Sequence, residues 1–439
     1  MIRCVCRLAA VLVCLLMAGV CLAEERFPPP DFTDHKLPLT IVPPHHTAVW
    51  QYVDLAVLVA ALSAASYLAL VKRSRRGLLL LSIGSLIWLG FVRQGCICPI
   101  GAIQNVSLGL CDSSYVIPLT ALAFFVLPLI YTLFFGRTFC AAVCPLGAVQ
   151  ELVAIRPVKV PDWLDQALGL LAYVYLGAGV LFASTGTAFL ICRYDPFVGF
   201  FRRSMGVNMA VLGGAFLVLG VFVGRPYCRY LCPYGAILGL LSKVSKWHVK
   251  IPPDTCIQCR LCEDACPYGA IVEPTVAQPL ADRPRARRRL LAMFVLAPLF
   301  IAAGGGLGTL TAVALAQLNP GVRLAERMRL EETGQVTGTT DASDAFRHSG
   351  RPTEELYQEA TAWIGQFRWF GGALGGWIGL VLAAKLIQLS IRRRRTDYEP
   401  ERAGCVSCGR CFWYCPKEQV RLGLMGDVSE LLSVKAGEK

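Results

Sequence analysis

Charged residues and histidines are both scarce in this chain of 439 residues. Only 17% of its side chains are charged, and charges are sparse inside its apolar runs, which argues against an ion-coupled transporter. No Cys-x2-Cys-His sequence occurs, so there is no attachment site for haem c. Haem held between helices by two histidines is not expected either, because no apolar run contains any of the five histidines, His35, His45, His46, His248 and His348.

Two glycine-rich stretches lack the preceding strand that a nucleotide-binding loop requires. GGGLG at 304–308 and GGALGG at 371–376 lie within apolar runs instead. We expect them to form small-residue faces at which membrane helices pack closely.

Apolar sequence is what the chain has in excess. Hydrophobic residues make up 55% of it, its mean hydropathy is +0.52, and several runs approach the roughly 20 residues that span a bilayer. The sequence therefore predicts an all-α polytopic membrane protein. Residues 1–23 have the layout of a secretory signal peptide, with Arg3 and Arg7 before an apolar core and Cys-Leu-Ala before Glu24. An uncleaved N-terminal anchor is the alternative.

Further apolar runs predict seven transmembrane helices after the signal segment, near 50–71, 77–94, 116–135, 164–184, 207–224, 290–316 and 369–391. If the mature N-terminus starts outside, all the basic clusters fall on one side, at 72–76, 156–159, 243–250, 283–289 and 392–395. Because positive charge is retained on the cytoplasmic side, we expect a multi-pass protein of the cytoplasmic (inner) membrane. Contact with anionic lipid accounts for the net charge of +13 without nucleic acid.

These segments divide the chain into six parts. A signal peptide or anchor is followed by an outer segment, a five-helix membrane core with three Cys-Pro-x-Gly-Ala motifs, a first ferredoxin-type motif, a transmembrane hairpin, and a second ferredoxin-type motif with the C-terminal tail. Their boundaries are 1–23, 24–49, 50–250, 251–282, 283–395 and 396–439. The hairpin carries a polar outer loop, 317–366, which we expect to be a flexible lid or docking arm.

Two runs of four cysteines are the strongest functional signal. CIQCRLCEDACP and CVSCGRCFWYCP both have the Cys-x2-Cys-x2-Cys-x3-Cys-Pro spacing of bacterial ferredoxins. Each run should help to hold a [4Fe–4S] cluster, and both should lie on the cytoplasmic side. Zinc is the alternative, although zinc sites favour two separated cysteine pairs. The candidate ligands are Cys256, Cys259, Cys262, Cys266, Cys405, Cys408, Cys411 and Cys415.

In two-cluster ferredoxins, the cysteine before the proline ligates the cluster of the other motif. Crossed ligation here would join the first three cysteines of one motif to the last cysteine of the other, giving Cys256, Cys259, Cys262 with Cys415, and Cys405, Cys408, Cys411 with Cys266. Two apolar runs separate the motifs, but two membrane crossings return the chain to its starting side. We therefore expect the motifs to meet as small cytoplasmic ferredoxin-like loops.

Two copies of a Cys-x3-Cys-Pro motif, FCAAVCPLGA and YCRYLCPYGA, lie at helix exits expected on the inner side. Proline is favoured at the first position of a helix, so each second cysteine should lie at a helix N-terminus, where the helix dipole favours a thiolate. The two pairs would supply four soft ligands to a further iron–sulfur or metal site. Unliganded thiols used for partner contact or thiol exchange are the alternative. The four residues are Cys140, Cys144, Cys228 and Cys232.

A shorter copy, GCICPIGA, should face the opposite side, because only one crossing separates it from the next copy. It contains Cys96 and Cys98, and the same side holds Cys111 and Cys192. These four residues are candidate redox or metal ligands. Disulfides are the alternative in an oxidising compartment.

The helix-flanked Cys-Pro copies and the two ferredoxin-type motifs together resemble the membrane-bound polyferredoxins of the NapH/NosR type. The resemblance covers most of residues 77–270 and the final motif. It implies electron transfer between quinol or cytoplasmic donors and envelope reductases, or support of their maturation, with the eight ferredoxin-type cysteines and the four inner Cys-Pro cysteines as cluster ligands. The chain departs from the pattern in its outward Cys-Pro copy and in the hairpin between its ferredoxin motifs.

We therefore expect a membrane-bound iron–sulfur protein that relays electrons between a cytoplasmic donor or the quinone pool and an acceptor or reductase on the outer side. It would be a subunit of an oxidoreductase system rather than a stand-alone enzyme, with two [4Fe–4S] clusters and one or two further sites at the Cys-Pro motifs. The other hypothesis is a redox-sensing or maturation factor for a metalloenzyme. The expected partners are the lipid bilayer, redox proteins on both sides and quinone.

Overall fold

The computed structural model describes residues 48–95, 99–203, 205–252, 256–275, 283–391 and 395–426. Within these ranges the chain is mainly helical, and only two short strands occur. The expected signal segment 1–23 and most of the outer segment 24–49 lie outside the described residues, as do Cys96 and Cys98.

Each predicted apolar run forms helix. The helices are α2 (Ala48–Leu70), α3 (Arg75–Ser85) continued by the π-helical η1 (Leu86–Val92), α5 (Leu119–Phe135), α8 (Asp162–Leu168) with α9 (Leu171–Ser184), α12 (Val207–Phe222), α16 (Arg283–Leu310) and α20 (Thr353–Ser390). By length and composition, five of these segments can cross a membrane, whereas α5 and α12 are shorter, with 17 and 16 residues.

Each inner Cys-Pro copy forms two short helices after a longer apolar one. The helices α6 (Thr138–Ala142) and α7 (Pro145–Leu152) follow α5, whereas α13 (Pro226–Tyr230) and α14 (Pro233–Ser242) follow α12. The outward copy continues into α4 (Pro99–Cys111). The proline of each Cys-Pro copy is the first residue of its helix, α4, α7 or α14, because the N–H that proline lacks has no partner in the first helical turn. This was predicted for α7 and α14.

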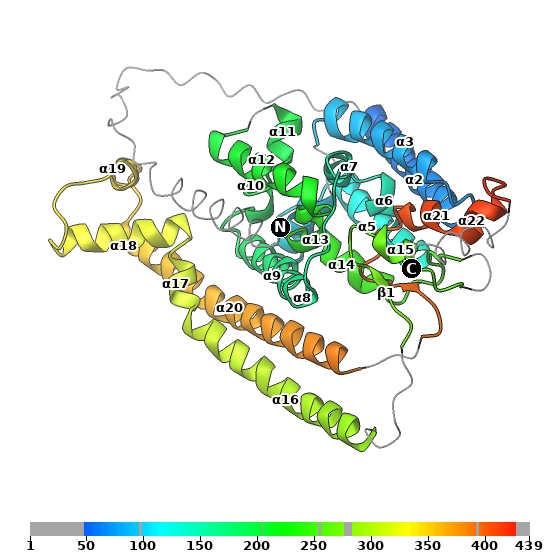
Figure 1. Ribbon diagram of the computed structural model, residues 1–439. Coiled ribbons are helices and arrows are strands. Elements are labelled where there is room, and N and C mark those ends of the chain that lie inside the picture. The colour runs from blue at the N-terminus through cyan, green and yellow to red at the C-terminus, as the bar shows by residue number, and fades with distance from the viewer. Residues whose placement is uncertain are drawn as a thin grey trace.

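Helices α16 and α20 form a long hairpin at one edge of the molecule (Figure 1). A Cβ atom on Gly304 would lie 2.2 Å from the carbonyl oxygen of Gly375, and one on Gly308 would lie 2.0 Å from that of Gly371. The two backbones therefore touch through their glycines, which confirms the predicted small-residue packing faces.

Replacing Gly375 with alanine should force the hairpin apart, because the new Cβ would lie 2.0 Å from the carbonyl oxygen of Gly304. We expect a loss of about 1–3 kcal/mol in the free energy of unfolding, the usual cost of overpacking. The measurement is the unfolding midpoint in detergent. Gly365→Ala is the matched control, because no atom lies within 4 Å of its added Cβ; equal losses in both variants would contradict the packing.

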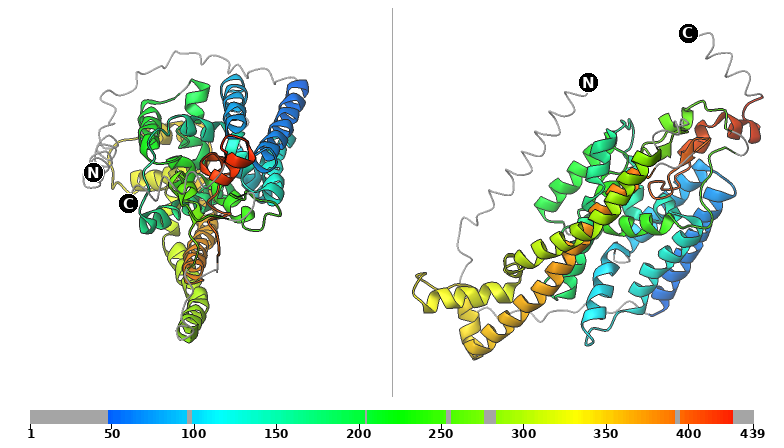
Figure 2. Two further views of the ribbon diagram at one scale, coloured as in Figure 1. Left: turned by 45° about the vertical axis from the view of Figure 1, so that its right-hand side comes forward. Right: turned by 90° about the horizontal axis from the view of Figure 1, so that it is seen from below.

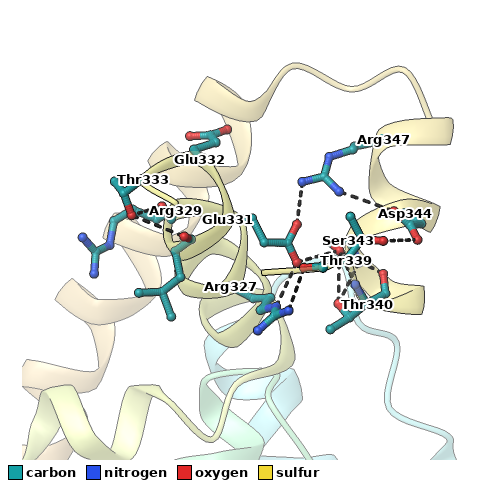
Figure 3. Close-up of polar contacts among 12 residues, drawn as sticks. Arg327, Arg329, Glu331, Glu332, Thr333, Thr339, Thr340, Ser343, Asp344 and Arg347 are labelled. Carbon is teal, nitrogen blue, oxygen red and sulfur yellow. Dashed lines mark hydrogen bonds and ion pairs between the residues drawn. The ribbon is translucent and has the colours of Figure 1, made fainter. Parts of the chain in front are cut away.

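The segment 317–366 is folded, which corrects the expectation of a flexible arm. After α17 (Ala312–Ala316), it forms α18 (Pro320–Glu332), α19 (Asp341–His348) and the start of α20. Glu331 forms ion pairs with Arg327 at 2.8 Å and with Arg347, and a capping box between Thr340 and Ser343 begins α19 (Figure 3). These contacts tie α18 to α19 as a helical cap at the end of the hairpin.

The two ferredoxin-type motifs come together as one small unit. The first supplies α15 (Leu261–Asp264) and β1 (Ile271–Val272), and the second supplies β2 (Glu399–Pro400), α21 (Arg410–Tyr414) and α22 (Pro416–Arg421). Strands β1 and β2 pair antiparallel, with Ile271 opposite Pro400. The prediction that the helical hairpin returns the chain to the first motif is thus confirmed.

Several of the basic clusters contact this ferredoxin-type unit. Arg73 forms an ion pair with the buried Glu418, Arg76 lies over the ring of Trp413, and Lys159 pairs with Glu263. The unit lies at one end of the molecule, and the cap of α18 and α19 lies toward the other (Figure 2, right). Two of the five basic clusters, 72–76 and 156–159, therefore lie beside the ferredoxin-type unit.

Candidate iron–sulfur site

The two ferredoxin-type loops have the same local backbone conformation. Gln258 and Ser407 occupy the third position of their motifs, each with φ of 55°. Arg260 and Gly409 occupy the fifth position, with φ of 67° and 75°. Left-handed residues turn successive peptide N–H groups toward one point, which suits an anionic group. The N–H of Gln258 already points to the sulfur of Cys256 at 3.4 Å.

Two hollows lie within the unit, and four cysteines line each. The residues that line the first include Cys256, Cys259, Cys262 and Cys415. Those that line the second include Cys266, Cys405, Cys408 and Cys411. The structure thus brings together the two crossed sets of cysteines that the motif spacing predicted.

The cysteines around these hollows suit a metal centre that binds thiolates. Burial raises the pKa of the Cys262 and Cys405 thiols to about 12. Neither would ionise near neutral pH without the charge of a bound metal centre, which deprotonates its thiol ligands.

The four cysteines of the inner Cys-Pro copies form a third group, which we call the inner quartet: Cys140, Cys144, Cys228 and Cys232. Cys144 and Cys232 are the residues just before α7 and α14, and both are buried. The N–H of Gly235 points to the sulfur of Cys232 at 3.2 Å, and Gln150 donates to the sulfur of Cys228 at 3.2 Å. The sulfur of Cys232 is close enough to those of the other three cysteines for their charges, when ionised, to interact. The predicted pairs are therefore gathered at one place.

An arginine three residues before the first cysteine of each copy crosses to the other copy. Arg225 lies over Gly147, with its Nη1 3.0 Å from where a Cβ would be, and donates to the carbonyl oxygen of Cys140. Arg137 lies over Gly235, with its Nη2 at 3.3 Å. The glycine of each Cys-Pro-x-Gly sequence thus leaves room for the guanidinium of the other copy. Sequence reasoning missed both arginines, although Gly-Arg-x-x-Cys occurs in both copies.

Glu151 links the inner quartet to the ferredoxin-type unit and was also missed. It is 4% exposed and pairs with Arg225 at 3.1 Å, with Arg75 at 2.5 Å and with Arg410 at 2.9 Å. The hydroxyl of Tyr268 also donates to it. Burial alone would raise the pKa of Glu151, but the three guanidinium groups and this hydrogen bond outweigh burial and lower it. Glu151 therefore remains ionised between elements from both parts of the protein.

The three groups of cysteines lie beside shared apolar clusters. Cys140 of the inner quartet packs against the cluster that contains Cys408 of the second hollow, and Cys405 and Cys266 pack against the same cluster. Cys266 also packs in the cluster that contains Cys415 and other cysteines of the first hollow. Two shared apolar clusters therefore lie between the first hollow, the second hollow and the inner quartet, in that order.

The outward cysteines are not all gathered. The sulfur of Cys192 lies 3.1 Å from where a Cβ on Gly101 would be, and its N–H donates to Gln104. Gln104 follows Cys98 at the spacing by which Gln150 follows Cys144. Cys111 ends α4, ten residues beyond Gly101, which is about 15 Å along a helix. The structure thus places Cys192 beside the first turns of α4 and Cys111 at the end of that helix.

Comparisons with known protein families identify iron–sulfur domains in the same regions. A family model described as "4Fe-4S binding domain" matches residues 117–162 and 205–252, which include both inner Cys-Pro copies. A second family model with that description matches residues 249–272, which include the first ferredoxin-type motif.

Curated relatives are similar over part of their length. The "Putative electron transport protein YccM" of Escherichia coli is 27% identical over 196 residues, 40% of this chain and 55% of that protein. "Protein NirI" of Paracoccus denitrificans is 36% identical over 32% of this chain and 22% of that protein. "Regulatory protein NosR" of Pseudomonas aeruginosa is 33% identical over 32% of this chain and 21% of that protein.

The chain therefore spans about half of YccM and about a fifth of NirI and NosR. No solved structure matches the chain. With its matches to 4Fe–4S binding domains, its apolar helices and these relatives, the chain is similar to the membrane-associated ferredoxin-type proteins of the NapH/NosR type.

Proposed function

We propose that this chain relays electrons between a cytoplasmic donor or the quinone pool and an acceptor on the outer side of the inner membrane. The carrying observation is that the two cysteine-lined hollows and the inner quartet pack against two shared apolar clusters, with Cys266 packed against both. A bilayer core is about 30 Å thick, so electrons need intermediate stations to cross it. The names of the relatives, which include an electron transport protein, support the same role.

The residues suited to hold clusters follow from the three groups. Cys256, Cys259, Cys262 and Cys415 would hold one [4Fe–4S] cluster, and Cys266, Cys405, Cys408 and Cys411 a second. The inner quartet would hold a third, a proposal supported by the 4Fe-4S family model that matches both of its copies. Bound clusters would supply one-electron transfer. The protein excludes water, donates hydrogen bonds to the sulfurs and fixes the distances between the groups.

The proposed orientation places the ferredoxin-type unit in the cytoplasm. Two basic clusters contact that unit, 72–76 through Arg73 and Arg76 and 156–159 through Lys159, and positive charge in membrane proteins stays on the cytoplasmic side. In this orientation seven helices cross the membrane, including the shorter α5 and α12, and the helical cap lies outside. Cys96, Cys98 and Cys192 would then face the outer acceptor.

A redox-sensing or maturation factor is the second candidate. The separation of Cys111 from Cys192 favours it, because the described outward cysteines do not form a group as compact as the inner quartet. Such a factor would respond to the redox state without sustained electron flow across the membrane.

Electron flow across liposomes distinguishes the two functions. With a reductant enclosed and an impermeant acceptor outside, the wild-type protein should reduce the acceptor, and Cys144→Ala should slow that reduction at least tenfold. Cys111→Ala is the matched control and should leave the rate unchanged. A wild-type rate no higher than that of empty vesicles would refute the relay and favour the accessory factor.

A further inference from the structure

Arg137 is a buried cation that has no carboxylate partner among the described residues. It is 8% exposed, and its guanidinium donates to the carbonyl oxygen of Ala403 at 2.8 Å and points to the sulfur of Cys140 at 3.8 Å. Its Nε has no hydrogen-bond partner in the part of the chain that the structure describes. A guanidinium does not lose its proton in proteins, so a charge buried in this way requires a nearby anion.

The equivalent arginine of the other copy makes the contrast clear. Arg225 occupies the matching position but pairs with Glu151 at 3.1 Å, a carboxylate that it shares with Arg75 and Arg410. Arg137 instead points to the sulfur of Cys140 at 3.8 Å and lies over Gly235, whose N–H points to the sulfur of Cys232. The thiolates of the inner quartet are therefore the natural counter-charge of Arg137.

Charges at the two hollows are compensated or reach solvent. Beside the first hollow, Arg260 is exposed and pairs with Glu263 and Glu273. Beside the second hollow, Arg75 and Arg410 share Glu151 and are partly exposed. Solvent and salt screen such charges. Among the described residues, Arg137 is therefore the buried guanidinium without a carboxylate contact, and it lies at the inner quartet.

We propose that Arg137 makes the inner quartet the most easily reduced of the three centres, so that electrons move from the ferredoxin-type unit into the membrane core. This inference rests on the proposed third cluster. Each step moves one electron from a reduced centre to the next oxidised one, and no bond forms or breaks. The potential of an iron–sulfur centre depends on nearby charge, on hydrogen bonds to its sulfurs and on solvent exposure. Burial opposes added negative charge at the quartet, and Arg137 offsets that penalty.

The test is a redox titration of the full-length protein, followed by EPR. The quartet signal is identified as the one that the double variant Cys144→Ala, Cys232→Ala lacks. Arg137→Gln should shift this signal to a lower potential, whereas Arg137→Lys, which keeps the charge, should retain most of the wild-type value. The other two signals should move much less.

Two further variants separate charge from folding. Gly235→Ala would place a Cβ 3.3 Å from Nη2 of Arg137 and displace that charge without removing it, so we expect a smaller shift in the same direction. Arg156→Gln removes an exposed charge and should shift none of the signals. If the Arg137→Gln protein does not fold or bind its clusters, the shift of the quartet signal is measured in Gly235→Ala instead.

The outcomes distinguish this inference from the function on which it rests. A quartet signal that is present but unmoved in Arg137→Gln and Gly235→Ala, or that has the lowest potential of the three, would overturn the role of Arg137 and leave the third cluster intact. About eight iron atoms per chain and only two signals would refute the third cluster, and the inference with it.

Discussion

Cys415→Ala should remove the cluster of the first ferredoxin-type motif and leave that of its own motif in place. Cys415 lines the first hollow with Cys256, Cys259 and Cys262, and no other cysteine of its motif does so. Loss of one thiolate should release the whole cubane on purification, because metal binding and local folding are coupled. We expect the iron content to fall by about four atoms per chain, with one EPR signal lost.

Double variants identify which cluster is lost. The double variant Cys256→Ala, Cys415→Ala should lose no more iron than either single variant, because both residues line the first hollow. Cys405→Ala combined with Cys415→Ala should lose about eight iron atoms, because Cys405 belongs to the second hollow. Uncrossed ligation predicts the reverse pattern, in which Cys405 and Cys415 behave as one unit and Cys256 and Cys415 do not.

The parts of the site that could be predicted are those whose chemistry fixes sequence spacing. A cubane requires three closely spaced cysteines and a fourth from elsewhere, so the spacing indicated both crossed sets before any geometry was known. Helix packing through glycine is similarly local, because Gly304 and Gly375 each mark a point where only a backbone without Cβ can approach another. The proline that begins α7 and α14 follows the same logic.

The parts that were missed depend on pairs of residues far apart in the chain. Arg75 belongs to a basic cluster beside an apolar run, and in the sequence such a cluster indicates only the orientation in the membrane. In the structure Arg75 pairs with Glu151 and donates to the carbonyl oxygen of Cys408. Arg137 and Arg225 likewise resemble ordinary positive charges at the ends of apolar helices. Their roles depend on the way each arginine reaches the glycine of the other Cys-Pro copy. A single sequence does not indicate which distant residues an arginine contacts.

The polar segment 317–366 shows a different kind of error. Its high content of Thr, Glu and Gly suggested mobility. In the structure, charged residues on α18 and α19 pair with each other across the turn, with Glu331 between Arg327 and Arg347 (Figure 3). Apolar positions such as Met328 and Phe346 pack beneath them. Composition alone missed this alternation because the charged face and the apolar face lie on the same short helices.

Glu151→Gln should separate the ferredoxin-type unit from the membrane core. Glutamine keeps the shape but removes the only negative charge that Arg75, Arg225 and Arg410 share within the described ranges. Removing one partner of a buried ion pair usually costs about 3–5 kcal/mol, and here three cations would lose their counter-charge. We expect the iron–sulfur absorbance to be lost at a clearly lower temperature, and the ferredoxin-type unit to be cleaved faster by protease.

Glu263→Gln is the matched control, because Glu263 lies in the first ferredoxin-type motif and pairs with Lys159 and Arg260, which are exposed. Surface pairs contribute about 0–1 kcal/mol, so the melting temperature should barely change.

The contribution of Glu151 to the free energy of unfolding of the wild-type protein also has a defined pH dependence. Because the pKa of Glu151 is lowered in the folded protein, its contribution is complete above the ordinary pKa of glutamate and is lost only as the pH falls through the lowered value. If the Glu151→Gln protein has the same melting temperature as the wild type, Glu151 does not hold the ferredoxin-type unit to the membrane core. The contact between Cys140 and the second hollow would then depend on apolar packing alone.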